Sequence, residues 1–526
     1  MPDAVVIGAG VNGLVTANLL AERGWSVVVL EGAELPGGAV RSGELTLPGH
    51  VHDLFSAFYP FAAGSPVMRR LELERHGLVW RRAPLVVAHP FADGRCAVLS
   101  RDVEETAASL EAFAPGDGAA WRRMLRAWTG TSDLLMEAFA TPFPPLRASA
   151  ALALRLRRPR TLARFGRFLS LPVRRMGEEW FGGLGGRMLL AGNALHADLP
   201  PELPGSGAFG WMMCGLGAEH GYPVPEGGAQ RLVEALVRRL RAHGGSVRCG
   251  EPVARVVVRR GRAVAVRTAA GAEVAARHGV LADVAAPALY GRLLAPEDVP
   301  ASIRAELPAF QRDDGTVKVD WALAGPIPWR APDARRAGTL HVTESVDELS
   351  EAMNQIARGL VPADPFLVIG QYSMTDPTRQ PAGAETAWAY THVPQSIRGD
   401  AGGDGLAGRW DERERERFAA RIEARIEALA PGFRKLIRAR HVFAPPTLEQ
   451  ADPNLLGGMI NGGTGQLQQM FPFRPLPSHL GRARGPLAGL YLASASAHPS
   501  GGVHGACGSN AARAAIAARL RRPLAR

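Results

Sequence analysis

Lysine and cysteine are scarce in this sequence. Lys318 and Lys435 are its two lysines, so 59 of the 61 basic residues are arginine, which indicates a compositional bias. The net charge of +11 is therefore weak support for a nucleic-acid partner, and none is expected. The four cysteines form no Cys-x-x-Cys pair, which argues against a zinc site or a disulfide framework, and no metal is expected.

Long apolar runs are also missing. No stretch of 18 apolar residues occurs, so we predict no membrane-spanning helix. The first predicted strand begins near Asp3, which leaves no room for a signal peptide, and a cytoplasmic location is the expectation. The zinc-protease pattern His-Glu-x-x-His and the hydrolase pattern Gly-x-Ser-x-Gly do not occur, so those two activities have no support.

The first 32 residues predict a strand, a glycine-rich turn, a helix and a second strand. The turn carries Gly8, Gly10 and Gly13 in the pattern Gly-x-Gly-x-x-Gly, and Glu31 ends the second strand. In this context the pattern predicts a dinucleotide site, because the glycines permit a tight turn and a close approach of backbone to pyrophosphate. The helix N-terminus favours the phosphates. Glu31 would accept hydrogen bonds from the adenosine ribose, and its charge disfavours NADP at this site.

A second glycine pair follows shortly after Glu31. Gly37, Gly38 and Arg41 would place another backbone stretch and a cation beside the expected phosphates. This is the usual second half of an FAD fingerprint rather than of a nicotinamide one. No second Gly-x-Gly-x-x-Gly follows a predicted strand, so no dedicated nicotinamide domain is expected. The sequence therefore favours FAD as the cofactor.

The C-terminal motifs resemble those of one flavoprotein family. Residues 489–492, 498–505 and 508–512 look like the closing FAD motif of phytoene desaturase-like flavoproteins, which belong to the amine oxidase superfamily. Among these, the chain most resembles the carotenoid ketolases and the pyridine nucleotide-disulfide oxidoreductase domain-containing protein 2 type. The resemblance covers nearly the whole chain and is weakest in the middle helices.

The resemblance implies roles for the matching positions. Gly501, Gly502 and Val503 would pass the isoalloxazine ring, and the N-terminus of the helix after them would stabilise the anionic reduced flavin. Val253 matches a backbone position that touches adenine in the family.

The expected fold class is α/β, a Rossmann-like FAD-binding domain with an interleaved α+β substrate domain of mixed sheet and helices. With 526 residues, the chain is too long for one ordinary core. We assign residues 1–95, 224–300 and 485–526 to the FAD-binding domain, and residues 96–223 and 301–484 to the substrate domain.

Hydrophobic spacing predicts the main elements. Helices are expected over 11–23, 229–243 and 411–430, and an alanine-rich helix within 501–522. Alternating apolar residues predict strands of a mixed sheet within 315–393, one of them through Tyr372 and Met374. Five large side chains of this region could line an apolar tunnel or form an ordinary core: Trp321, Tyr372, Met374, Trp388 and Tyr390.

Three residues are candidates for catalysis. Lys318 stands on a predicted cavity strand in a chain that otherwise uses arginine, and the resemblance implies a lysine near flavin N5. An ordinary strand lysine is the alternative. His52 could form an acid–base pair with Asp53 or anchor a loop. His504 flanks the expected flavin loop and could contact a substrate.

The resemblance implies an FAD-dependent dehydrogenase or desaturase. Such an enzyme moves a hydride to flavin N5 from an apolar, extended small molecule, such as a polyene, an isoprenoid or another natural product. A diffusible electron acceptor, oxygen or a quinone, would reoxidise the flavin. The alternatives are a ketolase or an NAD(P)H-using reductive cyclase of the same family, and a non-enzymatic binder of prenylated or lipid-like ligands.

Residues 147–175 are strongly basic. They contain nine arginines and no acidic residue, interleaved with leucines and phenylalanines. A basic amphipathic segment can lie on an anionic membrane surface, so the segment predicts either a peripheral membrane contact or a solvated helical lid.

Overall fold

A five-stranded parallel sheet organises one half of the molecule. The computed structural model describes residues 1–521. The strand order is β21-β13-β1-β2-β9, and every pairing is parallel. Both β1 and β13 are entirely buried apolar runs, as expected for strands covered on two faces. The strands are β1 (Ala4–Ile7), β2 (Val27–Leu30), β9 (Ser246–Arg248), β13 (Gly279–Ala282) and β21 (Leu490–Leu492).

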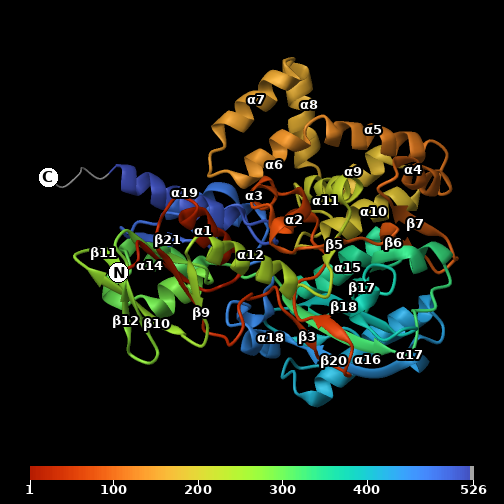
Figure 1. The fold of residues 1–526 in the computed structure, drawn as a ribbon. Helices are drawn as coiled ribbons and strands as arrows, with labels where there is room; N and C mark the ends of the chain where they lie inside the picture. Colours follow the sequence, from red (N-terminus) through yellow and green to blue (C-terminus); the bar gives the residue numbers. More distant parts are fainter. Residues whose placement is uncertain (522–526) are drawn as a thin grey trace.

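Three helices pack together against this sheet (Figure 1). They are α1 (Val11–Ala21), α12 (Gln230–Ala242) and α19 (Ala506–Leu520). The other side of the sheet carries a small antiparallel layer of β10 (Val253–Arg259), β11 (Arg262–Thr268) and β12 (Glu273–Ala275). The predicted helix at 229–243 is confirmed to within one residue at each end, and α1 ends two residues before its predicted end.

A seven-stranded mixed sheet organises the other half, in the order β20-β14-β18-β17-β15-β6-β7. Neighbouring strands are antiparallel except β15 and β6. One face is covered by α16 (Glu412–Leu429), which begins where Asp411 caps the Glu414 N–H. The strands are β6 (Leu85–Pro90), β7 (Cys96–Leu99), β14 (Gly315–Leu323), β15 (Ala337–Val342), β17 (Leu367–Gln371), β18 (Glu385–Val393) and β20 (Ile437–Phe443).

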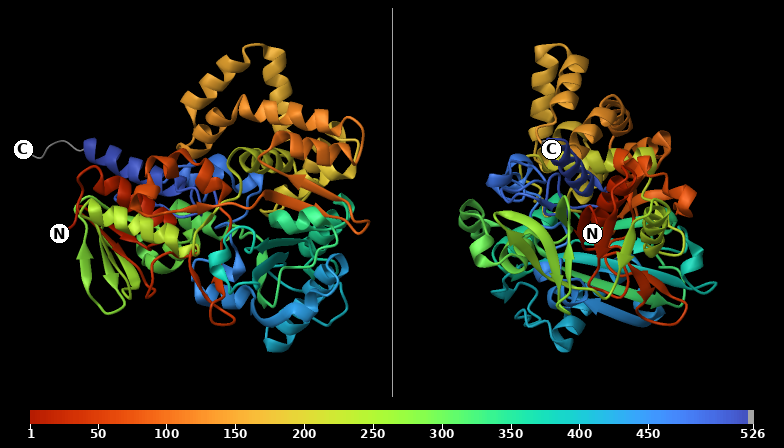
Figure 2. Two further views of the ribbon diagram at one scale, coloured as in Figure 1. Left: turned by 45° about the vertical axis from the view of Figure 1, so that its right-hand side comes forward. Right: turned by 60° about the vertical axis from the view of Figure 1, so that its left-hand side comes forward.

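A group of helices covers the opposite face of the seven-stranded sheet. Two of them, α7 and α8, project from the body as a hairpin (Figures 1 and 2). Within residues 1–521, no helix combines the length and the apolar character needed to cross a membrane. The helices are α4 (Val103–Glu111), α5 (Asp117–Thr129), α6 (Ser132–Ala140), α7 (Leu146–Leu156), α8 (Pro159–Ser170), α9 (Val173–Trp180), α10 (Leu184–Ala194) and α11 (Ser206–His220).

The C-terminal helix lies within its predicted range. It begins at Ala506, because Gly502 and Gly505 have φ of +104° and +69° and keep the chain before it in a loop. One predicted element is wrong. The predicted strand through Tyr372 and Met374 does not exist. Strand β17 ends at Gln371, and the chain then turns, with the Asp376 N–H bonded to the Tyr372 carbonyl.

Candidate functional site

One large cavity, about 1470 Å³ in volume, connects the two halves of the molecule. It reaches from the carboxyl ends of β1 and β2 to one face of the seven-stranded sheet. The rest of its wall includes residues of α6, α8 and α11 and of the segments near 55–61, 450–471 and 494–503. A ligand lying in this cavity would therefore touch both sheets.

The first turn after β1 has the shape that a dinucleotide pyrophosphate requires. Gly8 has φ of +88°, and a Cβ atom on Gly10 would come within 2.6 Å of the Asp283 carboxylate. A Cβ atom on Gly13 would overlap the Gly8 carbonyl oxygen. Only glycines permit this packing, and it turns the N-terminus of α1 toward the cavity, which Val11 and Asn12 line.

The other predicted residues of this end lie around the same turn. Glu31 accepts hydrogen bonds from the N–H groups of Ala9 (2.6 Å) and Ala33 (2.9 Å). Gly37 pairs with Gly10 as an isolated bridge, and Gly38 lies against the Cα atom of Gly10. The cavity wall here includes Glu31, Gly37, Gly38, Arg41 and Val253.

Arg41 is fixed by backbone rather than by an acid. Its Nε donates to the Gly38 carbonyl (2.9 Å) and its Nη2 to the Ala451 carbonyl (2.7 Å). Its guanidinium also lies 5.2 Å from the centre of the Phe55 ring. The described residues thus leave its charge without an ion pair, which suits an anionic ligand.

Asp283 is a residue of this end that the sequence analysis missed. It follows β13, and its Oδ2 accepts the Gly13 N–H at 2.7 Å. Burial raises its pKa to about 7, and Asp452 and Glu31 add to the rise. A polar residue directly after an apolar parallel strand could have been recognised, because ligands bind at the carboxyl ends of such strands.

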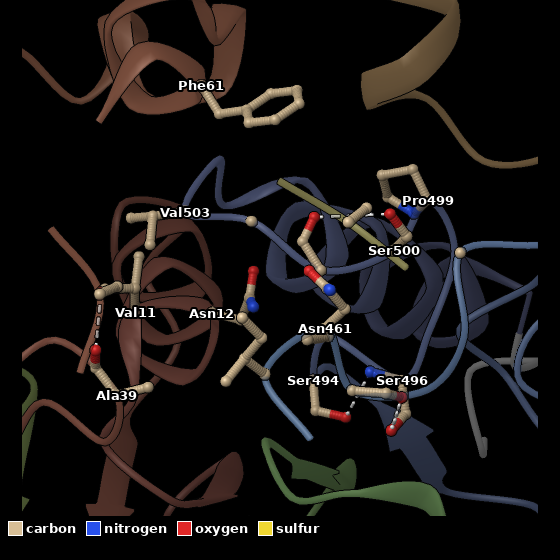
Figure 3. A pocket seen from close by; sticks show the side chains of 18 of the residues that line it. Val11, Asn12, Ala39, Phe61, Asn461, Ser494, Ser496, Pro499, Ser500 and Val503 are labelled. Atoms are coloured by element: carbon tan, nitrogen blue, oxygen red, sulfur yellow. Dashed lines mark hydrogen bonds between the residues drawn. The ribbon is translucent and has the colours of Figure 1, made fainter. Parts of the chain in front are cut away.

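The loop between β21 and α19 forms a second wall of the cavity. Figure 3 shows Val503 beside Val11, with Asn461, Ser494 and Ser496 on the facing side and Phe61 above. Gly501 and Gly502 line the cavity with Val503. A Cβ atom on Gly501 would come within 2.6 Å of the Asn461 Cα atom, so the loop needs glycine there.

His504 lies behind this loop and not in the cavity wall. Its buried ring has Nε2 at 3.1 Å and 3.2 Å from the carbonyl oxygens of Ser500 and Gly501, and its Nδ1 accepts the Ala506 N–H. Burial lowers its pKa to about 4. The ring is therefore neutral, and its hydrogen bonds hold the loop in place. His504 does not reach the cavity in which a substrate would bind.

Arg474 braces the same wall from outside. It is buried, and its guanidinium donates to the carbonyl oxygens of Asn461, Thr464 and Ala495, each at 2.8 Å. Burial lowers its pKa. The loops that carry Asn461 and Ala495 are therefore tied together by one cation.

Lys318 lies in the cavity wall and is almost completely buried. Its Nζ donates to the Asp53 carbonyl oxygen at 3.0 Å and pairs with Asp320. Burial alone would raise the pKa of Asp320, but the charge of Lys318 and the hydrogen bond from His52 outweigh it and lower that pKa. Two of the three ammonium N–H groups are thus engaged, and one remains for the cavity.

His52 stands one layer behind Lys318. Its Nδ1 is 3.4 Å from Asp320 and its Nε2 is 2.8 Å from the Thr46 hydroxyl. It does not line the cavity, and neither does Asp53. His52 and Asp53 do not bond each other but bond different partners, so His52 can reach a ligand only through Asp320 and Lys318.

Asp53 joins the two halves of the molecule. Its Oδ1 accepts from the Ser42 hydroxyl and the Ala229 N–H, and its Oδ2 accepts from Tyr372 and Arg379, each of the last two at 2.7 Å. Arg379 is completely buried and pairs with Asp376 as well.

The five side chains proposed for an apolar tunnel separate into groups. Trp388 and Tyr390 line the cavity. Trp321 points to the opposite face of the sheet and donates to Glu423, Tyr372 lies beneath the wall, and Met374 is 45% exposed. The cavity-wall alternative therefore holds for Trp388 and Tyr390 and the core alternative for Trp321 and Tyr372, whereas Met374 fits neither. Alternation along one strand does not say which face holds the cavity.

Comparisons with known proteins agree with this arrangement. The family described as flavin containing amine oxidoreductase matches residues 12–317. Pyridine nucleotide-disulfide oxidoreductase domain-containing protein 2 of Rattus norvegicus is 30% identical over 97% of this chain and 92% of its own length. A neurosporene-forming phytoene desaturase of Cereibacter sphaeroides is 25% identical over 98% and 94%. Among solved structures, a putrescine oxidase bound to putrescine has a TM-score of 0.59 at 17% identity over 99% of both chains, which shows the shared fold.

FAD binding should depend on pH through Asp283. Below pH 7 the carboxyl is neutral, and above pH 7 its charge opposes a nearby pyrophosphate, with Glu31, Asp452 and the cation of Arg41 facing the same space. The dissociation constant of FAD should therefore rise with pH above about 7, by at most about tenfold per pH unit. Fluorescence titration of the apoprotein with FAD at several pH values measures this dissociation constant. Asp283→Asn should flatten the dependence, and an unchanged slope in that variant would contradict the assignment.

Arg379→Met should destabilise the protein strongly. It leaves Asp53 and Asp376 buried without their cation, which typically costs about 3–5 kcal/mol. Urea unfolding followed by tryptophan fluorescence gives the free energy of unfolding. Arg336→Met is the control, because its guanidinium is 47% exposed and such pairs contribute less than about 1 kcal/mol. Equal losses in both variants would show that the buried pair is not a link between the halves.

Proposed function

The chain belongs to the flavin-containing amine oxidoreductase family and is an FAD-dependent oxidoreductase, and we propose that its substrate is an extended apolar molecule that it dehydrogenates. The observation that carries the proposal is the cavity of about 1470 Å³, which continues from the dinucleotide turn along the seven-stranded sheet to the base of α8. Carotenoid desaturases of similar sequence support a polyene or another isoprenoid as the substrate class.

We assign the cofactor to the end of the cavity at the carboxyl edge of the parallel sheet. The glycine turn and the N-terminus of α1 would face the pyrophosphate, Glu31 the ribose, and Val253 the adenine. The Gly37–Arg41 segment would lie beside the phosphates, and the Gly501–Val503 loop would lie along the isoalloxazine ring. We propose residues 1–95, 224–300 and 485–526 as the FAD-binding domain, of which 522–526 lie outside the described residues. Strand β6, at the end of the first segment, pairs instead with the seven-stranded sheet.

The bound FAD supplies a hydride acceptor, and the chain supplies position and environment. The apolar wall formed by α11 and by Phe58, Phe61 and Trp388 orients a hydrocarbon chain and excludes water from the reacting bond. Lys318 holds a fixed positive charge at Nζ, and its remaining N–H can donate to an atom in the cavity. Because the dielectric there is low, this charge stabilises negative charge that develops next to it. His52 and Asp320 are positioning residues for Lys318.

A diffusible electron acceptor completes the proposed cycle. The described residues contain one dinucleotide turn, so the reducing equivalents would leave through oxygen or a quinone that reaches the same cavity. A ketolase or an NAD(P)H-dependent reductive activity would use the same cavity and is separated from the dehydrogenase by the assay below.

The hairpin of α7 and α8 is the surface that we propose for peripheral membrane contact. Leu146 and Leu154 are 72% and 68% exposed. The hairpin also exposes seven arginines, which are Arg147, Arg155, Arg157, Arg158, Arg160, Arg164 and Arg167. The cavity reaches its base, because Ser149, Gly166 and Leu169 belong to the cavity wall. A lipid-soluble substrate could thus enter from a membrane surface without crossing water.

Anaerobic reduction of the flavin tests the reaction. We expect the absorbance of the FAD-loaded protein near 450 nm to fall when phytoene in detergent micelles is added, and a longer polyene absorption to appear. The same loss with NADPH and none with any polyene would contradict the dehydrogenase and favour the reductive alternative.

Lys318→Met should slow this reduction by about 100-fold without loss of bound FAD, because it removes the cation that the seven-stranded sheet contributes to the cavity wall. Stopped-flow absorbance measures the rate and the spectrum gives the FAD content. Lys435→Met, which changes the exposed second lysine, should leave the rate unchanged. A normal rate in the Lys318 variant would refute the role.

Flotation with lipid vesicles tests the membrane surface. Replacing Arg157, Arg160 and Arg164 with Gln should reduce binding to vesicles that contain 30% phosphatidylglycerol by more than tenfold, since each basic residue near an anionic surface contributes about 1 kcal/mol. A matched triple replacement of exposed arginines elsewhere should have little effect; it uses Arg241, Arg260 and Arg438. Equal binding of the two triple variants would count against this surface.

A further inference from the structure

The apolar cavity has a polar end on the seven-stranded sheet. The polar end consists of His196, Thr339 and Tyr390, all of which line the cavity. Tyr390 on β18 pairs with Lys318 on one side and with Val368 on the other, and Val368 pairs with His341 on β15. Since neighbouring strands lie about 4.8 Å apart, the polar end spans about 10 Å across three strands and begins one strand beyond Lys318.

The hydroxyl groups of the polar end have no partner within residues 1–521. The Thr339 hydroxyl is buried, with 1% of the residue exposed, and no described atom bonds it. No described residue donates to or accepts from the Tyr390 hydroxyl, although Trp388 and His392 contact its ring. Buried polar groups in folded proteins are nearly always hydrogen-bonded, so the unpaired Thr339 hydroxyl, with the half-buried Tyr390 in the same cavity wall, points to a polar ligand atom.

His196 adds a third polar group. Its Nε2 lies 2.8 Å from Nε2 of His341, so one ring donates to the other, and no described residue bonds its Nδ1. Burial lowers the pKa of His196 to about 4 and lowers that of His341 well below its ordinary value, so both rings are neutral. The polar end can therefore donate and accept hydrogen bonds but carries no charge.

The charges around the cavity distinguish a charged from an uncharged oxygen group on the ligand. Lys318, one strand away, is already paired with Asp320. A carboxylate or phosphate at the polar end would add a buried charge without a counter-ion, which is costly, whereas a hydroxyl or carbonyl would complete a hydrogen bond to Thr339 or to Tyr390.

We propose that the substrate is an apolar chain that carries an uncharged oxygen group, a hydroxyl or a carbonyl, at the end bound by His196, Thr339 and Tyr390. The inference rests on the proposed function, because it assigns the substrate class of the same cavity. The bound oxygen sets the position of the substrate's hydrocarbon chain relative to Lys318. The polar end therefore also determines which carbon–carbon bond faces the flavin. A pure hydrocarbon would bind in several registers.

Binding of matched ligands to the FAD-loaded protein tests this assignment. The probes are all-trans-geranylgeraniol, the same chain with a methyl group in place of the hydroxymethyl group, and geranylgeranic acid. Quenching of tryptophan fluorescence reports binding, because Trp388 lies in the cavity wall. We expect the alcohol to bind about tenfold more tightly than the hydrocarbon, as one hydrogen bond to a neutral group allows, and more tightly than the acid.

Variants locate the effect. Thr339→Val with Tyr390→Phe should remove the preference for the alcohol and leave the affinity for the hydrocarbon unchanged. Thr343→Val is the matched control, because the Thr343 hydroxyl is also buried and unbonded but lies outside the cavity wall. Equal affinities for the alcohol and the hydrocarbon, or tighter binding of the acid, would contradict the assignment of an uncharged oxygen group to the polar end. The proposal of an apolar substrate would be unaffected. Failure of all three probes and of phytoene to bind would instead overturn the proposed function.

Discussion

The carboxylate of Asp53 is the contact on which the rest of the site depends. It is completely buried and receives four hydrogen bonds, from Ser42, Ala229, Tyr372 and Arg379. The first two donors belong to the half with the parallel sheet, and the last two to the half with the seven-stranded sheet. A buried ion pair contributes little net stability compared with an apolar replacement of both partners. Removing one partner, however, strongly destabilises the protein, because the other charge is left buried and unpaired. Its main consequence here is geometric, because it fixes one sheet relative to the other.

That alignment sets the position of Lys318. The Asp53 carbonyl oxygen accepts from Nζ, and Asp320 fixes the charge from the other side. The same residue therefore holds the two halves together through its carboxylate and orients the one cavity lysine through its backbone. A shift of the seven-stranded sheet by even one strand spacing would move Lys318, Trp388 and Tyr390 together relative to the glycine turn. The contacts of Asp53 thus connect the glycine turn, the Lys318 cation and the polar end in one arrangement around the cavity.

Sequence patterns predicted the parts of the site that are local in the chain. The Gly8–Gly13 turn, Glu31 and the Gly37–Arg41 segment lie within about 40 residues, and their spacing alone indicated a dinucleotide fold and FAD. The fold class, the family and the cofactor are confirmed. Contacts between distant residues were missed, because Asp53 and Arg379 are 326 positions apart and Gly13 and Asp283 are 270 apart. Periodicity also failed at Tyr372, where an apolar alternation continues beyond the end of the strand.

This geometry explains why position 318 is a lysine in a chain that otherwise uses mostly arginine. The site of Lys318 offers two acceptors, the Asp53 carbonyl and the Asp320 carboxylate, in a wall where the residue is 3% exposed. A lysine has three donors, so these two acceptors leave one donor for the cavity. An arginine would bring five donors in a planar fork, and several of them would stay unsatisfied in the apolar wall. The cost of those unpaired donors disfavours arginine here, although the chain uses it at nearly every other basic position. Lysine at 318 therefore follows from the number of acceptors around it, independently of any role in the reaction.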